Sequence, residues 1–206
     1  MTATAFTERL QSKTLSDSLA KAVADAKEGD YQFPSHVKTV VARIQSDIRD
    51  NGSSAFFLTI QYLPEHLNPR TLHKYFIDTY KRMLTLLFTR HYGKRRYRAL
   101  YPQAFAFYDE PDDEHKTPHH HVVLVAQPSV STLLRDLYSK NKLTNKALPS
   151  VKTFHLEDID PSNQGLERVI LYSCKTALRT DSSTAANDSY KIIELPKDIW
   201  GTNENK

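Results

Sequence analysis

The sequence predicts an α+β domain in which helices pack on an antiparallel sheet. Short runs rich in aromatic and β-branched residues, such as AFFLTIQYL at 55–63 and HHHVVLVA at 119–126, are typical of buried strands. Longer segments, such as 70–92, carry apolar residues at every third or fourth position, as on the buried side of a helix. The runs at 104–110 and 119–126 follow one another across a short loop, which indicates a central antiparallel hairpin.

Each element is predicted from its own local pattern. Residues 1–30 have scattered apolar positions and indicate a weakly amphipathic helix, and 35–50 has them at clear helical spacing before Asn51-Gly52 ends the run. After these we expect, in order, a strand at 55–63, a helix at 70–92, strands at 104–110 and 119–126, a helix at 129–138, a strand at 151–159 and a helix at 165–179. This β-α-β-β-α-β-α order predicts a ferredoxin-like or related α+β sheet with helices on one face.

Three regions follow from this order. Residues 1–52 form an N-terminal helical extension, 53–180 form the core that contains the sheet, and 181–206 form a polar C-terminal tail. The apolar residues near the end of the tail, Trp200 above all, are expected to pack back onto the core.

Composition excludes several classes of protein. A chain of 206 residues is the size of one domain, and its formal charge of +4 permits an anionic partner without requiring one. The one cysteine, Cys174, excludes an internal disulfide and favours a reducing, cytoplasmic setting. The longest apolar runs, such as VVLVA at 122–126, fall far short of the roughly 20 residues that span a bilayer, so no membrane partner is expected.

Three histidines open the strand at 119–126. Alternate side chains of a strand share a face, so His119 and His121 point the same way and His120 points with the apolar residues. If the hairpin pairs 110 with 119 and 108 with 121, Glu110 and Tyr108 join the two imidazoles on that face. One carboxylate and two imidazoles suit Mg²⁺ or Mn²⁺ at a phosphate oxygen. A register slip of one residue would present Asp109 instead of Glu110.

The last predicted helix places a tyrosine among cations. At about 100° per residue, Arg168, Tyr172, Lys175 and Arg179 form one stripe. The opposite side consists of apolar residues that would pack on the sheet: Leu166, Val169, Ile170 and Ala177. Tyr172 is then either a packing residue of an amphipathic helix or a nucleophile toward a phosphodiester, with the cations stabilising phosphate charge.

A basic segment with interleaved tyrosines occupies 90–101, RHYGKRRYRALY. Cations on phosphates and rings under bases are what single-strand binding uses, so Arg95, Arg96, Tyr97 and Arg98 are candidate DNA contacts. The alternative is a solvated helix end, where cations are also favoured. His155, in the strand at 151–159, either faces the metal site or is an ordinary hydrogen-bonded histidine.

Taken together, these motifs resemble those of the HUH endonucleases, which include rolling-circle replication initiators, some transposases and the relaxases. FFLTI at 56–60 is similar to the first strand of that family, EPDDEHKTPHHHVVLV at 110–125 to its histidine motif, and Tyr172-Ser-Cys-Lys175 to its tyrosine helix. The resemblance covers about 55–180. Two features depart from the family pattern: His120 stands where the family usually has an apolar residue, and the helix has a single tyrosine.

The resemblance implies a specific reaction. Tyr172, aided by Lys175, would attack a phosphodiester of single-stranded DNA, form a 5′-phosphotyrosine link and free a 3′-OH. Glu110, His119 and His121 would hold Mg²⁺ or Mn²⁺, and Arg168 and Arg179 would contact the DNA. An initiator of plasmid or phage rolling-circle replication would act at an origin hairpin, and with no ATPase motif in this chain it would depend on a host helicase. A single-tyrosine transposase, a small relaxase, a non-catalytic nucleic-acid-binding module and a metal-dependent RNA-processing enzyme are the alternatives.

Overall fold

The computed structural model describes residues 35–63, 69–109, 117, 119–144, 146–159, 165–173 and 193–196. Its elements are α2 (Ser35–Asn51), β1 (Ser54–Tyr62), α3 (Pro69–Phe88), the short 3₁₀ helices η2 (Thr89–His91) and η3 (Arg95–Leu100), β2 (Gln103–Asp109), β3 (His119–Ala126), α4 (Pro128–Ser139), β4 (Val151–Asp158), α5 (Gly165–Ser173) and β5 (Ile193–Leu195). Among the described helices, none combines the length and apolar character needed to cross a bilayer.

The strands form one five-stranded sheet in the order β4-β1-β3-β2-β5, and all neighbouring strands run antiparallel. The expected α+β class and the central β2–β3 hairpin are therefore confirmed. The strand β3 lies in the middle, paired along its length with β1 on one side and with β2 on the other. The short edge strand β5 comes from the region that the sequence predicts only as a tail.

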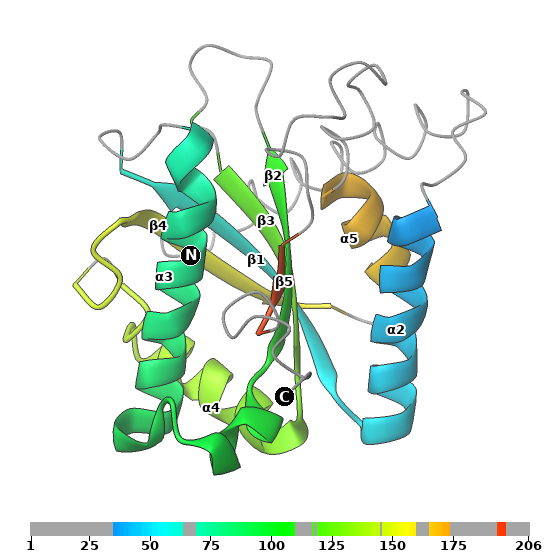
Figure 1. The fold of residues 1–206 in the computed structure, drawn as a ribbon, viewed down its shortest axis with the longest axis horizontal. Coiled ribbons are helices and arrows are strands. Elements are labelled where there is room, and N and C mark those ends of the chain that lie inside the picture. Colours follow the sequence, from blue (N-terminus) through cyan, green and yellow to red (C-terminus); the bar gives the residue numbers. More distant parts are fainter. Residues whose placement is uncertain are drawn as a thin grey trace, which may run out of the picture.

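Helices cover both faces of the sheet, so the prediction of helices on one face is wrong. Side chains of α3 and α4 pack on one face against residues such as Phe56 and Leu58 of β1. Side chains of α2 and α5, including Ile44 and Ile170, pack on the other face against Phe57. Figure 1 shows α3 and α4 on one side of the sheet and α2 and α5 on the other. Because helices cover both faces of the sheet, β1 is buried on both sides, and this explains why its sequence is mostly apolar.

The helix α2 joins the body of the molecule rather than standing apart from it. Ile44 is 1% exposed within the apolar layer that α2 and α5 share, and Arg43 bonds to Glu194 of β5 at 3.0 Å and to Gln103 of β2 at 3.2 Å. The helix predicted at 35–50 is confirmed, and it covers one face of the sheet. Trp200 and residues 1–34 lie outside the described residues.

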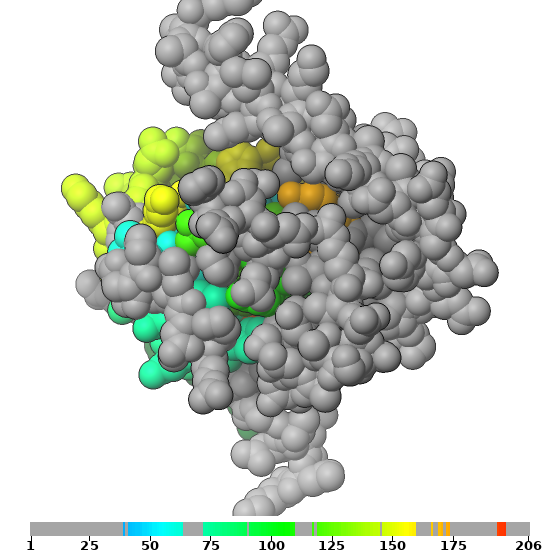
Figure 2. Space-filling model, turned by 90° about the horizontal axis from the view of Figure 1, so that it is seen from above, coloured from blue at the N-terminus to red at the C-terminus, as the bar shows by residue number. Residues whose placement is uncertain are grey.

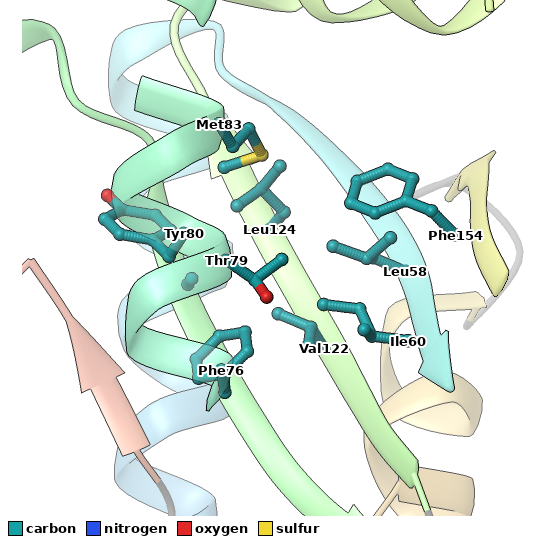
Figure 3. A pocket seen from close by; sticks show the side chains of 10 residues that line it. Leu58, Ile60, Phe76, Thr79, Tyr80, Met83, Val122, Leu124 and Phe154 are labelled. Carbon is teal, nitrogen blue, oxygen red and sulfur yellow. The ribbon is translucent and has the colours of Figure 1, made fainter. Parts of the chain in front are cut away.

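A small cavity of about 10 Å³ lies between α3 and the sheet, with room for one water molecule at most. Figure 3 shows its lining, in which Leu58, Val122 and Leu124 of the sheet face Phe76 and Met83 of α3. The strands thus meet α3 across a nearly close-packed apolar interface.

Truncating a side chain of this interface in the variant Leu124→Ala is expected to lower the free energy of unfolding by about 3–5 kcal/mol. Leu124 is 0% exposed, and its loss would enlarge a void that already exists. Urea denaturation of the variant and of Leu133→Ala, whose side chain on α4 is 44% exposed, provides the comparison. The surface substitution should cost no more than about 0.5 kcal/mol. Equal losses for the two variants would contradict the packing described.

Candidate metal centre

The register of the β2–β3 hairpin decides which carboxylate meets the histidines. Asp109 pairs with His119, and Tyr108 pairs with His120. The predicted register, 110 with 119, is therefore wrong by one residue. Asp109 takes the place predicted for Glu110, which itself lies outside the described residues, and Tyr108 belongs to the opposite face.

Asp109, His119 and His121 bring three potential ligand atoms together. The Nε2 atoms of the two imidazoles lie 3.1 Å apart, and Asp109 Oδ2 lies 3.1 Å from Nε2 of His121 and 3.3 Å from Nε2 of His119. Ligand atoms at right angles around a cation, each about 2.1 Å from it, are about 3.0 Å apart. The spacing of the three atoms therefore fits coordination of one divalent cation.

Hydrogen bonds to the outer ring nitrogens orient both imidazoles. Nδ1–H of His119 donates to the carbonyl oxygen of Thr117 at 3.0 Å, which leaves a lone pair on Nε2. Nδ1 of His121 lies 3.4 Å from Oγ1 of Thr59. With the proton of His121 on Nδ1, two imidazole lone pairs and a carboxylate face one another within 3.3 Å. Such a group repels itself unless a cation or a proton lies between its members.

The burial of these three side chains increases the need for a positive charge between them. The side chains of Asp109 and His121 are 1% and 2% exposed, and that of His119 is 12% exposed. A buried carboxylate with little access to water needs a compensating positive charge. Two imidazoles and one carboxylate are a ligand set that several divalent cations accept, with positions left open for substrate oxygen atoms.

His120 lies on the other face of the sheet, as predicted. It is fully buried beside Phe76 and His73, whose ring centroids lie 5.3 and 5.7 Å from its own, and Nδ1 is 3.0 Å from the hydroxyl of Tyr62. Burial lowers the pKa of His120 well below its usual value, so this imidazole is neutral. It is a packing residue and takes no part in the cluster.

Tyr172 lies beside the cluster. Its ring centroid is 4.8 Å from that of His121 and 6.1 Å from that of Phe57. Figure 2 looks onto the end of the sheet where β2 ends and β3 begins, and shows the end of α5 (orange) at the same end of the molecule. The sequence predicts Tyr172 on the side of α5 that faces away from the sheet, and this is wrong. Tyr172 is 8% exposed and packs toward the sheet together with Leu166 and Ile170.

The remaining predicted residues divide into two groups. Glu110, Lys175 and Arg179 lie outside the described residues, as does the side chain of Arg168. The basic residues Arg95, Arg96 and Arg98 are described and exposed on η3, with the guanidinium of Arg96 5.0 Å from the ring centroid of Tyr97.

The structure does not bring η3 to the metal centre. Helix η3 comes just before the start of β2, whereas Asp109 is the last residue of that strand. Seven residues of strand at about 3.3 Å each separate the two by roughly 20 Å. Figure 1 accordingly shows the green 3₁₀ helices below the sheet and the end of β2 above. Any DNA contact made by η3 would therefore lie on a surface separate from the metal centre.

Replacing both Arg95 and Arg96 by alanine is expected to weaken binding of a fluorescent oligothymidylate and to flatten its salt dependence. Each phosphate contact contributes about 0.7 to the slope of log K against log salt for single strands, so the slope should fall by about 1.4. Lys140→Ala is the control, because Lys140 is already paired with Asp136 at 2.7 Å. A slope that is the same in wild type and double variant would remove η3 from the DNA-binding surface.

Sequence reasoning missed Asp109 as the favoured ligand and overlooked Thr59 and Thr117 beside the imidazoles. Thr59 had a signal, since it is the one polar residue in the run FFLTI. Comparisons of the chain with protein-family models, with curated proteins and with solved structures give no match. The geometry of these side chains is therefore the basis for assigning a function.

Proposed function

We propose that this chain is a divalent-cation-dependent enzyme of the HUH type, which cuts and rejoins single-stranded DNA through Tyr172. The observation that supports it most is the contact of the Tyr172 ring with His121, at 4.8 Å between centroids. It brings a candidate nucleophile next to a candidate metal ligand that lies 51 residues earlier in the sequence. The order β4-β1-β3-β2 with helical connections β1-α3-β2 and β3-α4-β4 supports a ferredoxin-like core for such an enzyme.

Each group has a defined role in this proposal. Asp109, His119 and His121 would hold Mg²⁺ or Mn²⁺, and a cation there would polarise a non-bridging oxygen of the scissile phosphate. The phenolic oxygen of Tyr172 forms a bond to phosphorus as the bond from phosphorus to the 3′-oxygen breaks. The phenolic proton passes to water and the 3′-oxygen takes a proton from water, which gives a 5′-phosphotyrosine and a free 3′-OH. One phosphodiester replaces another, so rejoining needs no ATP.

The surroundings of Tyr172 suit an attack that excludes competing water. Its ring packs edge-on against Phe57 and is tilted against His121, so two aromatic neighbours limit the movement of the ring. Fixing a nucleophile in this way removes rotational freedom before the reaction begins. The hydrolysis of a covalent intermediate is also slowed when its surroundings are largely buried.

The covalent intermediate provides the test. Purified protein is incubated with Mn²⁺ and a pool of end-labelled single-stranded oligonucleotides, and the products are separated on a denaturing gel. We expect a slowly migrating protein–DNA species that is absent with EDTA and whose modified peptide contains Tyr172. An adduct on another residue would contradict the proposed nucleophile.

A second function is favoured by the burial of Tyr172. At 8% exposure it has the accessibility of a packing residue, and the cluster could then serve a metal-dependent nuclease that activates water. Such an enzyme would release free ends from DNA or RNA and form no adduct, so the same gel separates the two functions.

The biological setting is proposed from the sequence resemblance. Initiation of rolling-circle replication at an origin hairpin, with a host helicase as partner, fits a chain with this chemistry. A single-tyrosine transposase and a small relaxase use the same chemistry on other DNA. Sequencing the DNA attached to trapped protein would identify which of these substrates it cuts.

A further inference from the structure

The face of the sheet that holds the metal centre continues with polar side chains as far as the β4 edge. His121 pairs with Thr59 of β1, and Thr59 pairs with His155 of β4, so the three form one row across the sheet. Residues directly opposite one another in antiparallel strands point to the same face. His155 therefore belongs to the same row as His121, and the backbones of the two residues lie two strand spacings, or about 10 Å, apart. Its ring lies at the β4 edge, since it is also within reach of Tyr138 on α4, the helix that covers the opposite face.

Hydrogen bonds fix the ring of His155. Nε2 lies 2.6 Å from Oε1 of Glu157, and because a carboxylate only accepts, Nε2–H is the donor. The hydroxyl of Tyr138 then donates to Nδ1 at 3.2 Å. The same bond from His155 holds the pKa of the Glu157 carboxyl below its usual value, so the pair stays intact at neutral pH.

The fixed ring remains accessible. The side chains of His155 and Glu157 are each 41% exposed, in contrast to the 2% of His121 in the same row. Tyr138 meets the ring edge-on, at an interplanar angle of 75°, and so does not lie parallel to its plane. Both ring nitrogens already have partners, so a ligand would meet the imidazole through its plane.

A groove lies on the α4 side of β4, next to Tyr138. Tyr138 lines this groove, of about 540 Å³, between the end of α4 and β4, together with Lys152 and Thr153, both exposed. A lysine and a hydroxyl at the rim of an open groove can contact a phosphate backbone. Lys152, at the rim of this groove, is three residues from His155 on β4.

We propose that His155 is a stacking platform for one base of the single strand that Tyr172 cleaves. This inference rests on the proposed function, which it extends from the chemistry to a substrate contact. Stacked nucleotides advance about 3.4 Å each, so the 10 Å or so between His121 and His155 corresponds to about three nucleotides. The base on His155 therefore flanks the scissile phosphate at that distance, and the strand crosses from β3 over β1 to β4.

Equilibrium binding tests the platform without any cleavage. Anisotropy of a fluorescent oligothymidylate is measured in EDTA for wild type, His155→Ala, His155→Phe and Leu133→Ala. Loss of a stacking partner corresponds to about a 5- to 150-fold weaker Kd, which we expect for His155→Ala. His155→Phe should stay within about three-fold of wild type, since phenylalanine stacks equally well although it cannot bond to Glu157. Leu133→Ala, also an exposed truncation, should not change the Kd.

Direct contact is checked by cross-linking an oligonucleotide that contains 5-iodouracil, with the cross-linked peptide identified by mass spectrometry. We expect His155 among the cross-linked residues. An unchanged Kd for His155→Ala, or an equal loss for His155→Phe, overturns the stacking platform. If the wild type forms the Tyr172 adduct while His155→Ala binds normally, only the platform fails. If the wild type binds no oligothymidylate at all, the platform and the proposed substrate class fail together.

Discussion

Tyr172→Phe is expected to form no covalent adduct with single-stranded DNA, a loss of roughly 10³-fold or more relative to wild type. The substitution removes only the hydroxyl, so the contacts of the ring with His121 and Phe57 remain possible and the fold is preserved. The nucleophilic oxygen is lost, and no other atom at the position can form the bond to phosphorus. The measurement is the fraction of labelled oligonucleotide retained with protein on a denaturing gel.

The matched control is Tyr75→Phe. Tyr75 lies on α3, on the opposite side of the sheet, with its ring centroid 6.3 Å from that of Tyr62. We expect this variant to form the adduct at the wild-type level. Adduct formation by Tyr172→Phe would transfer the nucleophile to another residue, and cleavage to free ends without an adduct would favour the metal-activated nuclease.

Asp109→Asn is expected to weaken binding of Mn²⁺ at least about 100-fold, beyond the 10- to 100-fold loss typical of an outer-shell partner. Asparagine has the size of aspartate but lacks the negative charge that compensates a cation in this buried site. At a Mn²⁺ concentration of about 100 Kd, the cation stabilises wild type by about 2.7 kcal/mol, and a variant with a 100-fold higher Kd by only about 0.4 kcal/mol. Thermal unfolding with and without Mn²⁺ measures the difference.

Glu110→Gln tests the register directly. The sequence alone favours Glu110 as the ligand, whereas the pairing of Asp109 with His119 favours its neighbour. Glu110→Gln should therefore retain the stabilisation by Mn²⁺ that Asp109→Asn loses. The reverse pattern would show that the hairpin pairs as the sequence first indicates, and the ligand set would have to be revised.

Much of the architecture was predictable because its signals are local. The strands β1 and β3 contain runs dominated by apolar residues and α3 has a long helical period, so their extents came out close to those of the structure. The edge strand Ile193–Leu195 was not predictable in this way, because three residues are too few to show a period. Its pairing with β2 depends on contacts distant in sequence.

The candidate metal ligands show how far sequence reasoning extends. Strand alternation alone correctly placed His119 and His121 together and His120 apart. The carboxylate was a different matter, because it depends on how two strands pair across a connection too long for its turn type to determine the register. A one-residue difference exchanged Asp109 for Glu110 and sent Tyr108 to the other face.

Tyr172 and η3 show two further limits. The cations around Tyr172 in the sequence suggested a solvated stripe, but the bulk of a tyrosine ring makes its burial against His121 and Phe57 favourable. For η3, the cations and tyrosines of 90–101 indicated DNA contacts but gave no distance to the site. Since the ligand lies at the far end of β2, the two are separated by the full length of that strand.

The central position of β3 has a consequence for how the candidate metal site would tolerate removal of a bound cation. Its backbone is paired on both sides over His119–Val125, and backbone amides in such a strand exchange with deuterium mainly through global unfolding. The sheet itself thus positions the candidate ligand residues. Small zinc domains differ, because they fold only around their metal. Chelation should leave the exchange pattern of β3 intact, so that one divalent cation can replace another without refolding.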